Sequence, residues 1–192
     1  MTQPLIHVRS LLGLALFCAF FILGQAQPQP AAPAAEPAAV SDPKGAIIIA
    51  ALEGAVAVTN NATGAALPAA KVAAGQVLFD GHTIKTGADG KVVLLFSTGT
   101  ISTVKADTTL NIKKFTQKKF DPAGAKLSEL DAEPSESDVN IDLEVGDMVV
   151  DIKKLNKGSS FNIDSPVGTA GIRGTRVGMN IRPAPGGGFT SK

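Results

Sequence analysis

The sequence has few of the residues on which most catalytic and metal sites depend. Its 192 residues include one cysteine, two histidines, no tryptophan and no tyrosine. The cysteine, Cys18, lies in an apolar run near the N-terminus, so a chain that loses this run has no thiol for a disulfide, a zinc site or a nucleophile. We therefore expect no catalytic residues, no bound cofactor and no bound metal.

The chain also lacks an excess of charge of either sign. It carries 18 basic and 17 acidic side chains, and one of the basic residues, Arg9, precedes the apolar run. A nucleic-acid-binding domain usually shows a clear basic excess, because it neutralises phosphates. We expect no nucleic-acid partner.

The N-terminal segment has the features of a secretory signal peptide. His7 and Arg9 precede an apolar run from Leu11 to Leu23, which is shorter than the about 20 residues that a membrane-spanning helix needs. Small residues then lead to Ala26, as signal peptidase requires. We expect residues 1–26 to be a cleaved Sec-type signal peptide, no transmembrane segment after cleavage, and a periplasmic or secreted protein.

Composition divides the rest of the chain into a linker, a domain and a tail. Residues 27–44 repeat proline and alanine, which predicts an extended linker. Residues 45–182 form the predicted domain, interrupted at residues 121–138 by an acidic loop rather than a calcium-binding one. The glycine-rich residues 183–192 predict a flexible tail.

The domain is predicted to be all-β. Short segments rich in β-branched residues, mostly alternating apolar and polar, are separated by turn signals such as Asp80-Gly81 and Asp89-Gly90. No segment has a sustained helical period. The predicted strands cover residues 46–50, 55–59, 76–79, 91–96, 109–115, 140–145, 148–155 and 160–164, and residues 176–181 also look like a strand.

Two segments could carry chemistry but are better explained by structure. His82, the histidine that remains after the signal peptide, sits in a turn with no nucleophilic serine nearby in sequence, so we expect an exposed turn histidine. A pair of carboxylates that hydrolyses glycosides stays an open alternative. The four lysines of residues 113–120 suggest surface binding, but Lys113 and Lys114 should face opposite ways on a strand. We expect an edge strand kept soluble by lysine.

The densest motif is the glycine-rich stretch at residues 167–178. Its glycines do not precede a helix and lack the spacing of a dinucleotide-binding loop. An anion-binding nest that uses Arg173 and Arg176 stays open. The stretch could also be a piece of architecture without a ligand.

Segments 54–60, 73–112 and 143–175 resemble, in this order, a FecR domain. The likeness covers about residues 53–175 and ends on Arg173-Gly174-Thr175. It departs from the family pattern at His82, Thr98 and Ser165. The matching positions are Gly75, Leu78, Gly81, Ile84, Thr86, Gly87, Val92, Leu94, Phe96, Gly99, Thr100, Thr109, Leu110, Ile112, Pro166, Ala170, Arg173, Gly174 and Thr175.

This resemblance implies an all-β fold of short stacked strands, β-solenoid-like, with a β-sandwich as the alternative. It implies structural roles for Gly81, Thr86, Gly87, Gly99, Pro166, Gly171, Arg173, Gly174 and Thr175. The last three would form a structural corner, in which Gly174 adopts a backbone angle closed to other residues, Arg173 donates to exposed carbonyls and Thr175 starts the next strand. Signalling members of the family carry an anti-sigma region and a transmembrane helix before this domain. A signal peptide and a linker stand there in this chain, so it looks like a stand-alone secreted member.

The resemblance therefore implies a non-enzymatic exported protein. It would mediate protein interaction or signal sensing at the bacterial cell envelope, with an envelope or secreted protein as its partner. The alternative is a binding module for an anionic envelope polymer. Such a module would use Lys153, Lys154, Arg173, Arg176 and the lysines of residues 113–119.

Overall fold

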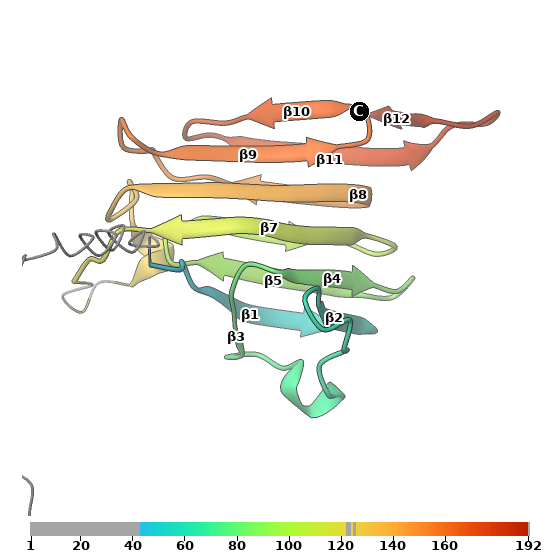
Figure 1. Cartoon of the computed structure of the whole chain (residues 1–192), viewed down its shortest axis with the longest axis horizontal. Helices are drawn as coiled ribbons and strands as arrows, with labels where there is room; N and C mark the ends of the chain where they lie inside the picture. Colours follow the sequence, from blue (N-terminus) through green and yellow to red (C-terminus); the bar gives the residue numbers. More distant parts are fainter. Residues whose placement is uncertain (1–42, 122–123, 125, 192) are drawn as a thin grey trace, which may run out of the picture. The chain divides into compact units, whose positions relative to one another are not determined.

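The computed structural model describes residues 43–121, 124 and 126–191. The predicted signal peptide and nearly all of the predicted linker therefore lie outside the described residues. The described part contains twelve strands and two short 3-10 helices, η1 (Ala69–Lys71) and η2 (Leu127–Glu129) (Figure 1). None of its helices has the length and hydropathy that a membrane span requires.

The strands form one sheet that folds back on itself into two layers (Figure 1). From one end to the other, the front layer contains β2 (Val56–Asn60), β4 (His82–Thr86), β7 (Thr109–Gln117), the first part of β8 (Ser137–Asp151), β9 (Ser160–Ser165) and β10 (Gly168–Gly171). The back layer contains β3 (Val77–Leu78), β1 (Ile47–Glu53), β5 (Lys91–Phe96), β6 (Ile101–Val104), the last part of β8, β11 (Arg176–Pro183) and β12 (Phe189–Ser191).

In each layer the strands lie side by side in the order in which they occur in the sequence. The exception is β3, which lies on the outer side of β1. The chain therefore rises through the stack as it alternates between front and back, which is the solenoid-like feature of the fold. Neighbouring strands are antiparallel except for β8 and β9. The prediction of an all-β fold of short stacked strands is confirmed. The two facing layers also share the geometry of a sandwich.

Strand β8 joins the two layers. The sequence predicted two strands here, separated by a turn at Gly146-Asp147, but one strand runs through both and changes layer at Gly146. Gly146 has a φ of 114°, and a Cβ built there would lie 2.2 Å from Thr108 Oγ1. Glycine allows the strand to bend without breaking, because it has no side chain to meet the neighbouring threonine.

Alternating side chains fill the space between the layers. Phe96 of β5 meets Phe115 of β7 and Phe161 of β9, with ring centroids 5.4 and 6.1 Å apart, respectively. All three rings are almost completely buried. Because β5 belongs to the back layer and β7 and β9 to the front, these rings bring the two layers together.

The prediction for the lysines of β7 was wrong in two respects. A β-bulge between Ile112 and Lys114 turns both Lys113 and Lys114 outward, while Ile112 and Phe115 stay in the core. The two lysines therefore do not face opposite ways. In addition, β7 lies between β4 and β8, so it is not an edge strand.

Two predicted loops are more ordered than expected. In the predicted tail, β12 pairs with β11 after a turn in which Gly186, Gly187 and Gly188 all have positive φ. In the predicted acidic loop, the side chain of Glu133 is buried and accepts hydrogen bonds from Asn156 N and Ser137 Oγ, both at 2.7 Å. Residues 122, 123 and 125 of this loop lie outside the described residues.

Candidate functional site

The corner at residues 172–175 connects β10 to β11 and rests on the segment that follows β8. Arg173 donates from Nη1 to the Ser159 carbonyl at 3.3 Å and from Nη2 to the Asn156 carbonyl at 3.0 Å. Gly174 has a φ of 93°, and a Cβ built there would lie 3.0 Å from Lys154 Cα. The Thr175 carbonyl accepts from Ile152 N at 3.1 Å. The donors of Arg173 are therefore directed at carbonyls within the fold.

Thr86, Gly87 and Gly81 lie at the ends of β4. Thr86 Oγ1 donates to the Lys105 carbonyl at 2.5 Å and accepts from Thr108 N at 3.0 Å. Gly87 N donates to the Ala55 carbonyl at 2.9 Å. Gly81 has a φ of 78°, and its N–H donates to the Ile112 carbonyl at 2.8 Å. These hydrogen bonds connect the two ends of β4 to residues in or next to β2, β6 and β7.

The remaining motif residues occupy separate turns and strand ends. Gly99 has a φ of 85° in the turn between β5 and β6, where a Cβ would lie 2.7 Å from the Leu127 carbonyl oxygen. Pro166 is exposed between β9 and β10, and Gly171 ends β10. The structure thus distributes the nine motif residues over several corners instead of gathering them around one cleft.

The outer surface of the front layer is a network of ion pairs. Lys113 Nζ lies 3.0 Å from Asp142 Oδ2 and 3.3 Å from Asp164 Oδ2, and Lys114 Nζ lies 2.5 Å from Asp138 Oδ2. At its edge Lys118 pairs with Glu136, and in the back layer Arg176 pairs with Asp151. Many of the cations proposed for binding a polymer are therefore already paired within the chain.

This network shifts the pKa of three of its members. A hydrogen bond to Asp142, followed by one to Asp164, raises the pKa of Lys113 against some desolvation. The hydrogen bond from Lys114 holds the pKa of Asp138 below its usual value, and Ser160 adds to this effect. The hydroxyl of Thr169 is the main cause of a lowered pKa at Asp164. All three shifts favour the charged forms of Lys113, Asp138 and Asp164.

His82 begins β4, and its Nδ1 lies 3.0 Å from the Phe79 carbonyl oxygen. The predicted turn histidine is thus part of a strand end and is half-buried. Within the described ranges, no three histidine, cysteine, aspartate or glutamate side chains are placed to hold a metal ion.

The outer surface of the back layer is, in contrast, apolar. Ile48 of β1 is in register with Leu95 of β5, which is in register with Ile101 of β6. All three side chains point away from the core and are half-buried. We call this surface the apolar strip. It consists of Ile48, Val77, Val93, Leu95, Ile101, Thr103 and Val149.

The upper part of the apolar strip is hollowed. A depression of about 360 Å³ is lined by Ile101, Thr103, Val149, Asp151 and Arg176. Nearby, a Cβ built at Gly178 of β11 would meet nothing within 4 Å, although Gly178 pairs with Val149. The absence of a side chain at 178 leaves this part of the surface open.

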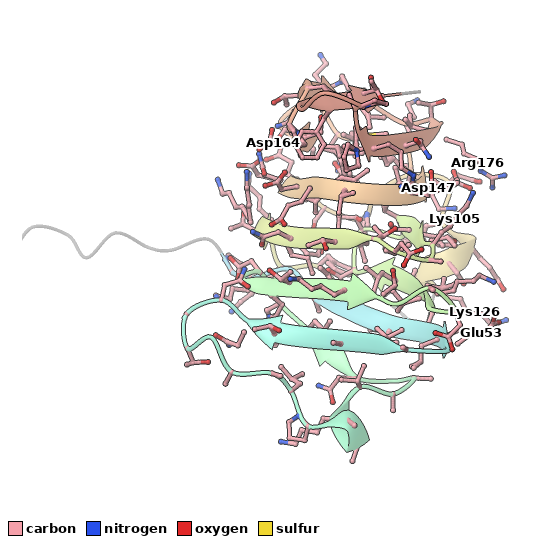
Figure 2. The ribbon with its side chains drawn as sticks, turned by 90° about the vertical axis from the view of Figure 1, so that its right-hand side faces the viewer. Glu53, Lys105, Lys126, Asp147, Asp164 and Arg176 are labelled. Carbon is pink, nitrogen blue, oxygen red and sulfur yellow. The ribbon has the colours of Figure 1, made fainter. Side chains whose placement is uncertain are left out.

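Charged residues border the apolar strip at both ends of its strands. Glu53, Lys105 and Asp147 lie at one end, whereas Arg176 and Asp151 lie at the other. In Figure 2, Glu53, Lys105, Asp147 and Arg176 all lie on the side of the back layer, and Asp164 lies on the side of the front layer. Lys91 approaches Glu53 only to 3.9 Å, whereas Asp147 accepts from both Asn180 and Arg182. At the other side of the strip, η2 lies against β5.

The apolar strip was not predicted from the sequence, although a signal for it was present. The residues KVVLLF of β5 and III of β1 do not alternate. Such runs are typical of strands that are covered on both faces. In this domain one face of each strand lies in the core and the other forms the strip.

Comparison with known proteins places the chain in a family. The family model described as FecR protein matches residues 82–188, from the start of β4 to the turn before β12. No curated protein and no solved structure matches the chain. The family is a signalling and regulatory one, associated with sensing at the cell envelope. Because the match covers more than half of the chain and agrees with the corner at Arg173-Gly174-Thr175, the chain belongs to the FecR protein family.

Proposed function

We propose that this chain is a non-enzymatic, exported FecR-domain protein that binds another protein at the bacterial cell envelope, as an interaction or sensing module. The observation that carries this proposal is the apolar strip. It crosses five strands of the back layer, and Val77 at its lower end is 40 % exposed. Contiguous apolar surface with a polar border is typical of protein interaction sites.

The opposite face carries charged side chains at its centre. Lys113 and Lys114 are paired there with carboxylates of β8 and β9, which an anionic polymer would have to displace. Displacement would leave those carboxylates without their partners and beside the polymer's own negative charge. The ion pairs therefore weigh against the polymer-binding alternative.

Site-specific photocrosslinking tests the protein-binding proposal. A photoreactive residue at Thr103, in the centre of the apolar strip, should yield a discrete crosslinked complex in the cells that produce the protein. The matched control places the same residue at Lys85, which is exposed on the front layer. Equal crosslinking from both positions, or none from Thr103, would contradict the proposal.

Export forms a separate part of the proposal and rests on the N-terminal sequence. Cleavage after Ala26 would leave Gln27 as the first residue of the mature chain. N-terminal sequencing of protein from the envelope fraction tests this expectation. A chain that keeps Met1 in that fraction would argue for a retained N-terminal anchor instead.

A further inference from the structure

We propose that the apolar strip binds an amphipathic helix whose apolar stripe is bordered by acidic residues. This inference rests on the proposed protein-binding function and specifies the chemistry of the partner. It follows from three features of the back layer: its backbone pairing, the dimensions of the strip and the charges at its border.

The backbone beneath most of the strip is already paired. β5 lies between β1 and β6, and β6 lies between β5 and β8, while β3 pairs with Ile47 and Ile48 of β1. An incoming strand therefore finds no free N–H and C=O groups along β5 and β6. A partner that docks on this face must satisfy its own backbone hydrogen bonds, as a helix does.

The dimensions of the strip suit a short helix. From Val77 on β3 to Val149 on β8 the strip crosses five adjacent strands, which corresponds to roughly 19 Å at the usual strand spacing. A helix of about 13 residues has this length. The strip is two side chains wide, as with Val93 beside Leu95, and this matches the apolar stripe of an amphipathic helix.

The charges at the border favour acidic residues in the partner. Lys91 and Lys105 are exposed and lie on the neighbouring strands β5 and β6 or just beyond. Lys105 makes no ion pair within the described ranges, and Lys91 has only the long contact to Glu53. Of the carboxylates at this end of the strands, Asp147 is held by Arg182, and Glu53 has only the long contact to Lys91.

The spacing of these two lysines also predicts the spacing of the acids. Adjacent strands lie about 4.8 Å apart, which is close to the 5.4 Å rise of one helical turn. Two acidic residues three or four positions apart on the helix can therefore face Lys91 and Lys105 together. The expected partner helix therefore has an apolar stripe with heptad-like spacing and two acidic residues, three or four positions apart, along one side of the stripe.

Fluorescence anisotropy with synthetic peptides tests this inference on the purified chain. The probe is a labelled 15-residue helical peptide with leucines along one stripe and two glutamates, four residues apart, beside it. Its matched control carries lysines in place of these glutamates. We expect the glutamate peptide to bind, and binding to weaken roughly fivefold or more in the Lys91→Glu/Lys105→Glu variant, since each exposed pair contributes a factor of up to about 5.

A charge swap makes the test specific. The Lys91→Glu/Lys105→Glu variant should prefer the lysine peptide, whereas Lys85→Glu on the front layer should change neither affinity. Thr103→Asp should reduce binding of the glutamate peptide by about tenfold or more, because it places a charge in the strip. Circular dichroism confirms that each variant is folded.

The outcomes separate this inference from the function on which it rests. A Thr103 crosslink without any preference for the glutamate peptide would overturn the helix inference and leave the protein-binding function standing. The absence of both would remove the two together. Binding that is unchanged by the charge swap would also overturn the inference.

Discussion

At the scale of single residues, two arginines that are three positions apart in sequence have different roles. Arg173 donates to the carbonyls of Asn156 and Ser159, which belong to the connection between β8 and β9. Arg176 forms one ion pair with Asp151, and its side chain is 71 % exposed. Backbone carbonyls at a corner lose a fixed partner when Arg173 is removed, whereas Asp151 stays in contact with water.

We therefore expect Arg173→Ala to destabilise the domain by about 1–3 kcal/mol and Arg176→Ala by less than about 1 kcal/mol. For a domain of this size, 1 kcal/mol corresponds to roughly 2–4 °C in Tm. Thermal unfolding followed by circular dichroism measures both variants. Equal melting temperatures would show that Arg173 does not hold the corner.

The carboxylates of the front layer make the stability of the domain depend on pH under acidic conditions. The pKa values of Asp138 and Asp164 are lowered from 3.8 in the folded chain. Their contribution to stability is therefore present above pH 3.8 and is lost as pH falls through the lower folded-state values. Urea unfolding between pH 2 and 6 should show stability decreasing below about pH 4.

Asp164→Asn supplies the matched comparison for this pH dependence. The variant should be less stable than the wild-type chain at pH 6, because it loses the charged partner of Lys113 and Thr169. The difference between the two proteins should become smaller as pH falls below 3.8, where Asp164 also becomes protonated. A constant difference across this range would contradict the assignment of the shift to Asp164.

At the scale of elements, the bend of β8 decides how the two layers are joined. A strand that runs through both layers can pair with β7 and β9 in the front layer and with β6 and β11 in the back layer. Gly146 allows this because its φ of 114° and its contact with Thr108 exclude a side chain. A turn signal in sequence thus marks a bend within one strand.

Gly146→Ala should destabilise the domain by about 3 kcal/mol or more, because it combines backbone strain with overlap against Thr108. The control is Gly178→Ala in β11, where the φ is not positive and a Cβ meets nothing within 4 Å. That variant should change stability by less than about 1 kcal/mol. Urea unfolding of the two variants tests the comparison, and a mild effect at 146 would disprove the bend mechanism.

At the scale of the whole domain, the folded part begins slightly before the predicted boundary. The Pro43 carbonyl accepts from Gln117 N at 2.9 Å, and Gly45 N donates to the Phe115 carbonyl at 2.9 Å. Lys44 also forms an ion pair with Asp80 at 2.7 Å. The last residues of the predicted linker therefore add a short paired segment beside the last residues of β7.

A variant that begins at Val40 should keep the melting temperature of the mature chain, whereas one that begins at Ala46 should melt several degrees lower. The shorter variant loses two backbone hydrogen bonds and an ion pair at the end of β7, which together contribute about 1–3 kcal/mol. Differential scanning calorimetry of both variants tests this boundary. Identical transitions would place the start of the folded part at or after residue 46.

The sequence by itself determined the all-β class, most strand positions and the corner residues. Segments in which apolar and polar residues alternate, and glycine-containing turns, are local signals. They indicate which secondary structure each segment prefers. The family motif is also local, since Arg173, Gly174 and Thr175 are consecutive. The short strands β4, β6 and β10 were not among the predicted strands. Serine, threonine and glycine in β6 and β10 look like turn residues.

Only the tertiary structure decided which surfaces are paired and which are open. The bulge that turns Lys113 and Lys114 to one face depends on the register between β7 and β8, and register is a property of two strands. The apolar strip likewise requires Ile48, Leu95 and Ile101 to lie in register on three strands, although they are far apart in sequence. Such surfaces arise from pairing between distant segments, which no single segment encodes.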